Sequence, residues 1–383
     1  MSNISIKRFN KSKVWKIACL ILIAFILLLR FCFRNNSTAA EFYIRNIYPT
    51  ITTIWRASNN IISFSISEIF VLLLPLLLMV LIVLSVIYLF RAESKKDFLI
   101  KYFKELASIS LALVTFFIST FFLNFGLAYH RKSLADNLGY EVRAINVEQL
   151  ARTTEVLVDE LNAIATSVTR DDNDQFISDI ELEELLKTVH LEYKNLAKLS
   201  DNDFLRNYLY HGAVRVKPVM LSHYWSYTST TGMFIPFWME SNVNIDISPD
   251  ELIFTALHEI AHSYGFAREN EANFLAFLVG RSSESINIRY SALLSGFVYL
   301  SNALYTANYD LHQDVYSNLN EKVKSDLNRR NVYWKQFQGT VKKISNKAND
   351  IYLKSNAQES GIKSYGEVVD LIVAFYDKLE HEN

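Results

Sequence analysis

The segment "HEIAHSYGFARENEANF", which begins at residue 258, contains two histidines and three glutamates, residue types and spacings that suit a metal site. His258 and His262 lie one helical turn apart, so both imidazoles can reach one ion if the segment is helical. Zinc suits such nitrogen ligands and leaves positions for a third protein ligand and a water. Glu259 directly follows the first histidine and is placed to accept a proton from that water. These residues predict a Zn²⁺ centre with a general base.

A third ligand is available in the segment "ENEANFLA". Glu269, Ala272, Asn273 and Ala276 fall at helical spacing on one face, so Glu269 is the expected ligand. Asn273 is expected to hydrogen-bond a ligand histidine. Glu271 is the alternative ligand, but it points elsewhere on the helix and is expected to face solvent. The other interpretation is that Glu269 only caps the second helix, because the helix dipole favours a negative charge at that end.

His258 and His262 are expected on a helix with clear start and end signals. Ser248 is a good N-cap, Pro249 fits the first helical position, and Glu251 completes a capping box. Gly265 is a natural stop. The expected core face is Ile253, Ala256, Leu257, Ile260 and Ala261, whereas the two histidines project from a different side. The alternative is that the charged residues only form the polar face of an ordinary amphipathic helix.

The composition of the 383-residue chain favours long helices and concentrated apolar segments. Half of the residues are hydrophobic although 21% are charged, and Gly and Pro number only 10 and 5. The net charge of −1 gives no reason to expect nucleic acid as a partner. The two cysteines, Cys19 and Cys32, lie in one apolar run, so no disulfide framework is available to the rest of the chain.

Three segments are long and apolar enough to cross a lipid bilayer, at about residues 17–33, 69–90 and 106–129. Lys and Arg are frequent before the first segment and between the second and third, and sparse between the first and second. This distribution predicts a cytoplasmic N-terminus and an extracytoplasmic C-terminal region. The first segment also has features of a cleaved signal peptide, but its long apolar run favours an uncleaved anchor.

Residues 1–130 are therefore expected to form a membrane region, and residues 131–383 a mainly helical domain outside the cytoplasm. Between about residues 214 and 247 the segments "VRVKPVML", "GMFIPFW" and "SNVNIDI" predict short strands. The expected fold class is three transmembrane helices plus a mainly α, α+β domain with a small sheet. The segment "ESNVNIDI" is expected at the edge of this sheet, where an extended peptide can pair with it; an ordinary buried strand is the alternative.

The order of motifs resembles that of the zincin metallopeptidases with a glutamate ligand. In these proteins HExxH is followed by E-x-x-A-[D/N]-x-x-A, which here implies zinc ligands His258, His262 and Glu269, with Asn273 in support. The interval between the two motifs is usually longer than in this sequence. The turn at Gly265 must therefore bring Glu269 back to the ion. Tyr365 and His223 are candidates for stabilising an oxyanion, although such residues more often pack or lie on the surface.

A wider likeness covers most of the chain. The three apolar segments, "TGMFIPFWMESNVNIDI", "HEIAHSYGFARENEANFLAFL" and "YLKSNAQESGIKSYGEVVDLIVAFY" together resemble domain-of-unknown-function family 3810. The resemblance implies a bacterial membrane protein with a zincin-like outer domain.

The leading functional hypothesis is a membrane-anchored zinc metallopeptidase that cleaves a peptide or protein substrate outside the cytoplasm. The first alternative is a non-catalytic metal-binding membrane module, a sensor or scaffold, against which the intact Glu259 argues. The second is a metal-free helical membrane protein, which requires coincidence in both motifs.

Overall fold

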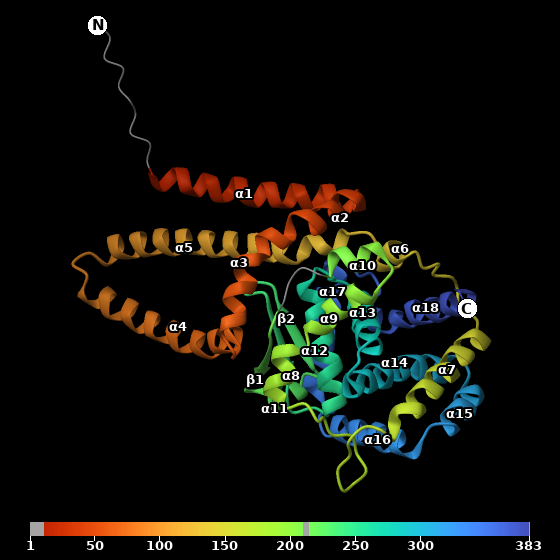
Figure 1. Cartoon of the computed structure of the whole chain (residues 1–383). Coiled ribbons are helices and arrows are strands. Elements are labelled where there is room, and N and C mark those ends of the chain that lie inside the picture. Colours follow the sequence, from red (N-terminus) through yellow and green to blue (C-terminus); the bar gives the residue numbers. More distant parts are fainter. Residues whose placement is uncertain (1–10, 210–213, 383) are drawn as a thin grey trace.

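The computed structural model describes residues 11–209 and 214–382, which form a helical body with three long helices projecting from it (Figure 1). These are α1 (Lys11–Arg34), α4 (Ile66–Arg91) and α5 (Lys95–Asn124). Each contains a stretch long and apolar enough to cross a membrane. The most apolar window of α4 is 0% buried within the protein, which is the expected state of a helix whose side chains face lipid.

The third predicted span is displaced from the observed helix. The helix α5 ends at Asn124, whereas the prediction extended to residue 129. The residues that follow form the short 3-10 helix η1 (Gly126–His130), in which Leu127 and Ala128 are almost fully buried. The apolar run is continuous in sequence because its last residues fill the core of the body, and hydropathy alone does not separate these two environments.

The connection between α1 and α4 folds onto the body. It consists of α2 (Ser37–Asn46) and α3 (Tyr48–Ile61), and Tyr43, Ile44 and Tyr48 belong to the main hydrophobic cluster. The remaining helices surround the cluster: α6 (Leu134–Leu138), α7 (Val147–Ala165), α8 (Leu182–Thr188), α9 (Leu191–Leu199), α10 (Asp203–Tyr208), α11 (Ser222–Ser226), α12 (Pro249–Ser263), α13 (Glu269–Arg281), α14 (Ile286–Ala307), α15 (Tyr309–Ser317), α16 (Glu321–Lys335), α17 (Thr340–Ser355), η2 (Gly361–Glu367) and α18 (Val368–Glu382).

A three-stranded sheet lies against α12. Its strands are β1 (Val216–Val219), β2 (Gly232–Ile235) and β3 (Glu240–Asn244), in the order β1-β3-β2. The strand β3 pairs parallel to β1 and antiparallel to β2. The predicted short strands are therefore confirmed.

The prediction that the segment beginning at Glu240 forms the sheet edge is wrong. All five residues of β3 are buried, because the strand is hydrogen-bonded on both sides. The alternative interpretation, a buried strand, is the correct one. The two edge strands are β1 and β2, of which β2 packs more extensively on α12.

A buried ion pair joins the sheet to the start of α4. Lys217 Nζ lies 2.7 Å from Glu240 Oε1, and both side chains are fully buried. The Glu240 carboxylate also accepts hydrogen bonds from the backbone N–H groups of Ile66 and Ser67, in the first turn of α4. In return, the backbone N–H groups of Met220 and Leu221 donate to Glu68 of α4. The sheet and the second long helix are thus held as one unit.

We expect Glu240→Gln to lower the stability of the full chain by about 3 kcal/mol, because it leaves the Lys217 ammonium buried without its carboxylate. Adding Lys217→Met to this variant should recover part of the loss, because the unpaired charge is then removed. Thermal unfolding in detergent measures both effects. Arg143→Ala, at a pair whose side chains are 74% and 75% exposed, is the control and should leave the midpoint unchanged. Equal midpoints for the wild type and Glu240→Gln would contradict a stabilising role for the buried pair of Lys217 and Glu240.

Candidate metal centre

The helix α12 carries both histidines and is buried on nearly every side. It begins at Pro249 after the N-cap Ser248 and ends at Ser263, so both predicted boundaries are confirmed. The Ser248 hydroxyl donates to Glu251 instead of accepting a backbone N–H. The predicted core face is buried, but so are His258 and His262, because the sheet, α13 and α14 all pack on this helix.

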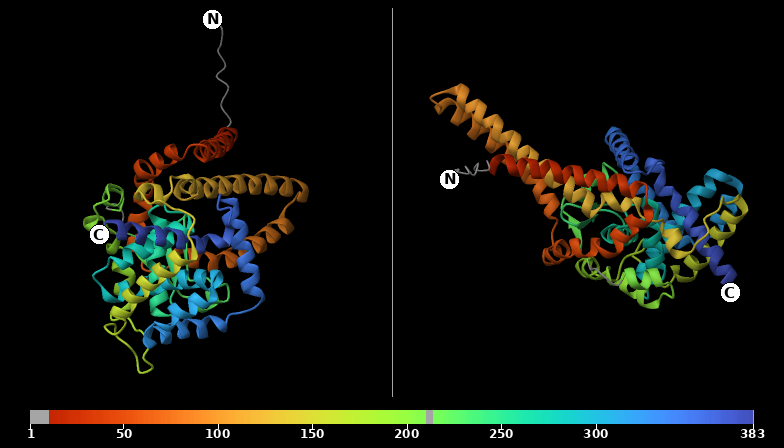
Figure 2. Two further views of the ribbon diagram at one scale, coloured as in Figure 1. Left: turned by 90° about the vertical axis from the view of Figure 1, so that its right-hand side faces the viewer. Right: turned by 90° about the horizontal axis from the view of Figure 1, so that it is seen from above.

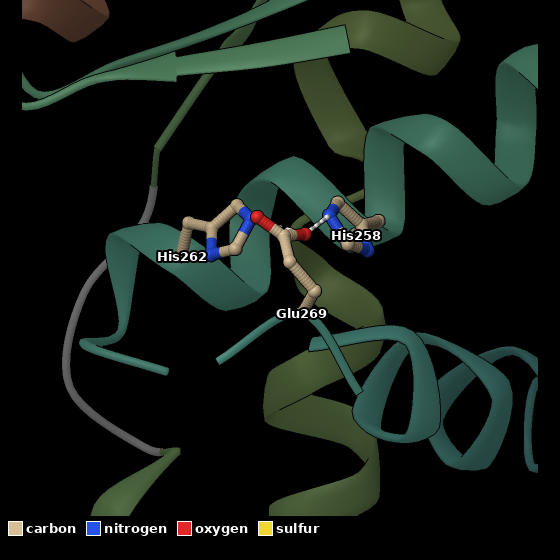
Figure 3. A group of neighbouring side chains, drawn as sticks. All are labelled: His258, His262 and Glu269. Carbon is tan, nitrogen blue, oxygen red and sulfur yellow. Dashed lines mark ion pairs between the residues drawn. The ribbon is translucent and has the colours of Figure 1, made fainter. Parts of the chain in front are cut away.

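Three side chains converge beside α12. His258 Nε2 lies 3.2 Å from Glu269 Oε2, and His262 Nε2 lies 3.5 Å from the same oxygen. Figure 3 shows the carboxylate lying between the two imidazoles. Of the described residues, only these three form a group of histidines, cysteines or carboxylates whose ligand atoms all lie within 4.8 Å of one another. The structure thus brings together the three predicted ligands from two helices.

The spacing of these atoms fits a zinc ion. Tetrahedral zinc with ligand distances near 2.1 Å separates its ligand atoms by about 3.4 Å, close to the two observed distances. Among the described residues, Glu269 Oε2 accepts no hydrogen bond of regular geometry although it is buried. The buried oxygen is therefore free to bind an ion that the two imidazoles also reach. Two imidazoles and one carboxylate also suit zinc better than calcium or magnesium.

The turn after α12 orients the second imidazole. His262 Nδ1 lies 2.7 Å from the backbone carbonyl of Phe266. A carbonyl oxygen only accepts, so Nδ1 carries the proton and Nε2 keeps its lone pair for a metal. Asn273 lies beside His258, as expected, and favours its protonated form, but no hydrogen bond of regular geometry joins the two side chains.

Burial and mutual charge shift the pKa values of the trio in opposite directions. Burial alone lowers the pKa of His262, but the carboxylates of Glu269 and Glu259 outweigh it and raise this pKa to about 9. Burial alone raises the pKa of Glu269, but the two imidazoles outweigh it and lower this pKa to about 2. These opposite shifts show that the surroundings of Glu269 favour a positive charge at this position, which is the charge that a bound divalent cation would supply.

Glu259 lies beneath the edge strand β2. A Cβ atom added to Gly232 would lie 2.4 Å from Glu259 Oε1 and 2.6 Å from Thr255 Cγ2, so only glycine permits this approach. Burial raises the pKa of Glu259 to about 8, with a further increase from the Glu269 charge. Glu259 Oε2 is buried without a hydrogen-bond partner among the described residues. Within the described part of the chain, no hydrogen bond or ion pair of the Glu259 side chain explains its buried position.

Helices outside the two motifs brace the turn that returns Glu269 to the histidines. Arg131 Nη1 donates to the carbonyl of Gly265, where φ is +82°, and Arg131 also forms a buried ion pair with Glu41 of α2. Tyr48 and Arg56 of α3 both donate to the carbonyl of Ser263. Sequence reasoning missed these residues, because these contacts join segments far apart in the chain and no local pattern reveals them.

Glu271 does not contact the trio. Its carboxylate accepts from the backbone N–H of Leu134 and from Arg268, and the residue is only 3% exposed. The prediction that it faces solvent is therefore wrong, because Arg268 and the start of α6 cover it. Glu269 is the first residue of α13, but its carboxylate points to the histidines instead of capping that helix.

The two candidates for an oxyanion-stabilising residue gain no support. His223 is exposed and pairs with Asp246, with Nδ1 2.9 Å from Oδ2, and its ring lies edge-on to those of Tyr227 and Phe337. Its hydrogen bond, ion pair and ring contacts in the described part of the chain do not include any member of the trio. The side chain of Tyr365 lies outside what the structure describes.

Comparison with known proteins places the chain in a family. A family model described as "Protein of unknown function (DUF3810)" matches residues 43–373, from within α2 to within α18. Neither the curated proteins nor the solved structures gave a match. The family match covers the sheet, both motif helices and two of the three long apolar helices. The chain therefore belongs to the DUF3810 family of proteins of unknown function.

Proposed function

We propose that the protein is a membrane-anchored zinc peptidase whose centre is His258, His262 and Glu269, with Glu259 as the general base. The supporting observation is the convergence of two Nε2 atoms and one carboxylate oxygen beside an otherwise unexplained buried carboxyl group. His258 and Glu269 keep about a tenth of their side-chain surface exposed (11% and 10%), so water has access to the trio.

When bound, zinc would polarise the substrate carbonyl and lower the pKa of the attacking water toward 7. Glu259 would take a proton from that water and give it to the departing amine. Its pKa is raised to about 8 without a cation, and a nearby positive charge would lower it, which favours the ionised base. Phe125 and Phe234, whose ring centroids lie 5.5 and 6.2 Å from that of His262, would limit access of bulk water.

The strand β2 offers a place for an extended peptide. Its outer edge has no main-chain partner among the described residues, and its first residue, Gly232, contacts Glu259. A peptide paired with this edge would pass close to the general base. The distribution of Lys and Arg around the long helices supports an extracytoplasmic position for the domain.

A non-catalytic metal-binding module is the alternative function. Such a site needs the trio but not Glu259, and burying a carboxyl group without a partner is unfavourable. The unpaired Glu259 Oε2 therefore favours catalysis over a purely structural or sensory role.

We expect the purified full chain to bind about one zinc per molecule. His258→Ala should lose the metal, whereas Glu259→Gln should keep it and lower peptidase activity at least about 100-fold, because it removes only the base. Elemental analysis and hydrolysis of a fluorogenic peptide mixture measure the two effects. A folded wild type that takes up no zinc on reconstitution, or full activity in Glu259→Gln, would overturn the proposal.

Gly232→Ala should reduce activity while zinc content stays at the wild-type level, because the three atoms nearest the added methyl group belong to Glu259 and Thr255 and not to the metal ligands. We expect a loss of about 10-fold or more in kcat, since a small displacement of a catalytic group is costly. Gly366→Ala is the matched control, because nothing lies within 4 Å of its added Cβ. Unchanged kcat in Gly232→Ala would count against a role for Glu259 beneath β2.

A further inference from the structure

The candidate metal centre lies at the end of a long apolar helix. Phe125 is the C-cap residue of α5, and its ring lies edge-on to the imidazole of His262, with centroids 5.5 Å apart. Phe125 also contacts Phe121 of α5 and Phe234 of β2. If α5 crosses a membrane, the trio is within one side-chain layer of the point where the helix leaves the bilayer.

The edge strand β2 leads directly into this boundary. The turn that follows it contacts both neighbouring long helices, through Phe237 against Phe117 of α5 and Trp238 against Phe70 of α4. The side chain of Asn124, the last residue of α5, donates to the carbonyl of Pro236 in the same turn. Phe117 precedes the end of α5 by seven residues, about 10 Å along the axis. One end of β2 is thus held beside apolar residues of α4 and α5.

The helix α17 has an exposed apolar stripe near the same ends. Val341, Ile344 and Ile351 are 53%, 65% and 60% exposed and share one face with Ala348 and Tyr352. Lys343, Lys347 and Lys354 form a neighbouring stripe, and the buried Leu353 points to the body. An amphipathic helix with apolar and basic stripes is typical of segments that lie in a membrane interface.

Contacts place the last turn of α17 at the level of the ends of α1 and α5. Arg30 of α1 donates to the carbonyl of Ser355, and the Tyr352 ring lies 6.5 Å from that of Phe121. Figure 2 shows α17, in blue, running across the direction of α5. A bilayer that surrounds α1 and α5 would therefore meet the apolar stripe of α17 along its length.

We propose that the site acts on an extended polypeptide segment immediately adjoining a membrane anchor, which pairs with β2 where the strand meets the bilayer surface between α5 and α17. This inference rests on the proposed peptidase function and adds its substrate class. A chain leaving the bilayer beside α5 would meet the free edge of β2 within a few residues. A soluble peptide would reach the same edge only after approaching the membrane surface.

The test uses the full chain in phosphatidylcholine–phosphatidylglycerol vesicles and a randomised peptide segment carrying a palmitoyl chain. In the first form the peptide segment is attached directly to the palmitoyl chain. In the second form a flexible spacer of about 20 residues separates the two, and a third form has no palmitoyl chain. A centre at the bilayer surface should cut the directly anchored form, with cut positions within about ten residues of the anchor by mass spectrometry. A centre far from the bilayer cannot be reached by a tether that is too short, so it would cut only the long-spacer form.

Cleavage confined to the long-spacer or soluble forms would overturn the inference and leave the peptidase proposal standing. Metal-dependent breakdown of the vesicle lipid in place of every peptide would overturn both. Zinc binding without cleavage of any form would also overturn the peptidase proposal and this inference with it. The Glu259→Gln variant in the same vesicles is the blank for contaminating proteases.

A second readout does not depend on activity. In a variant with Cys19→Ser and Cys32→Ser, a fluorophore on Ile344→Cys should be quenched strongly by spin-labelled lipid, whereas one on Lys343→Cys should be quenched about 3-fold less, because the two positions lie on different stripes of α17. Replacing Val341, Ile344 and Ile351 together by Ser should slow cleavage of the directly anchored peptide more than that of the long-spacer form. Equal, weak quenching at both positions would contradict a membrane contact of α17.

Discussion

The geometry of the candidate site depends on one short connection, from His262 to Glu269. This link must reverse the chain within a few residues, and Gly265 permits it by adopting a left-handed conformation with φ of +82°. The same turn presents the carbonyl of Phe266 to His262 and leaves the other ring nitrogen facing Glu269. Arg131 fixes the carbonyl of Gly265 from the other side. This turn therefore orients His262 and positions Glu269 beside it.

The contacts that stabilise this turn also connect the site to the long apolar helices. Tyr48 and Arg56, from the connection between α1 and α4, both hold the carbonyl of Ser263 at the end of α12. The carboxylate of Glu240 in the central strand accepts from the first turn of α4, and Phe125 at the end of α5 lies against His262. Side-chain contacts thus join the residues before and after residue 130, the predicted boundary between the membrane region and the domain. The arrangement of the centre therefore depends on contacts with the three long apolar helices and their connections.

Local signals predicted the parts of this structure that depend on near neighbours in sequence. The bounds of α12 follow from Ser248, Pro249 and Gly265, and the trio follows from helical spacing once the turn is granted. The order of the strands could not be read in the same way, because alternation in a short strand does not reveal which strands flank it. Burial of Glu271 depends on α6, and the approach of Gly232 to Glu259 on sheet packing, and both contacts join residues distant in sequence.

The central claim is that His258, His262 and Glu269 together bind zinc as the geometry suggests. X-ray absorption at the zinc edge of the reconstituted full chain tests it most directly. The account predicts a four-coordinate ion with two imidazole nitrogens at about 2.0 Å, oxygen from a carboxylate and water, and no sulfur. It also predicts that Glu269→Gln alters the oxygen shell but retains both imidazoles. A sulfur shell, or a six-coordinate ion bound only by oxygen, would contradict the account.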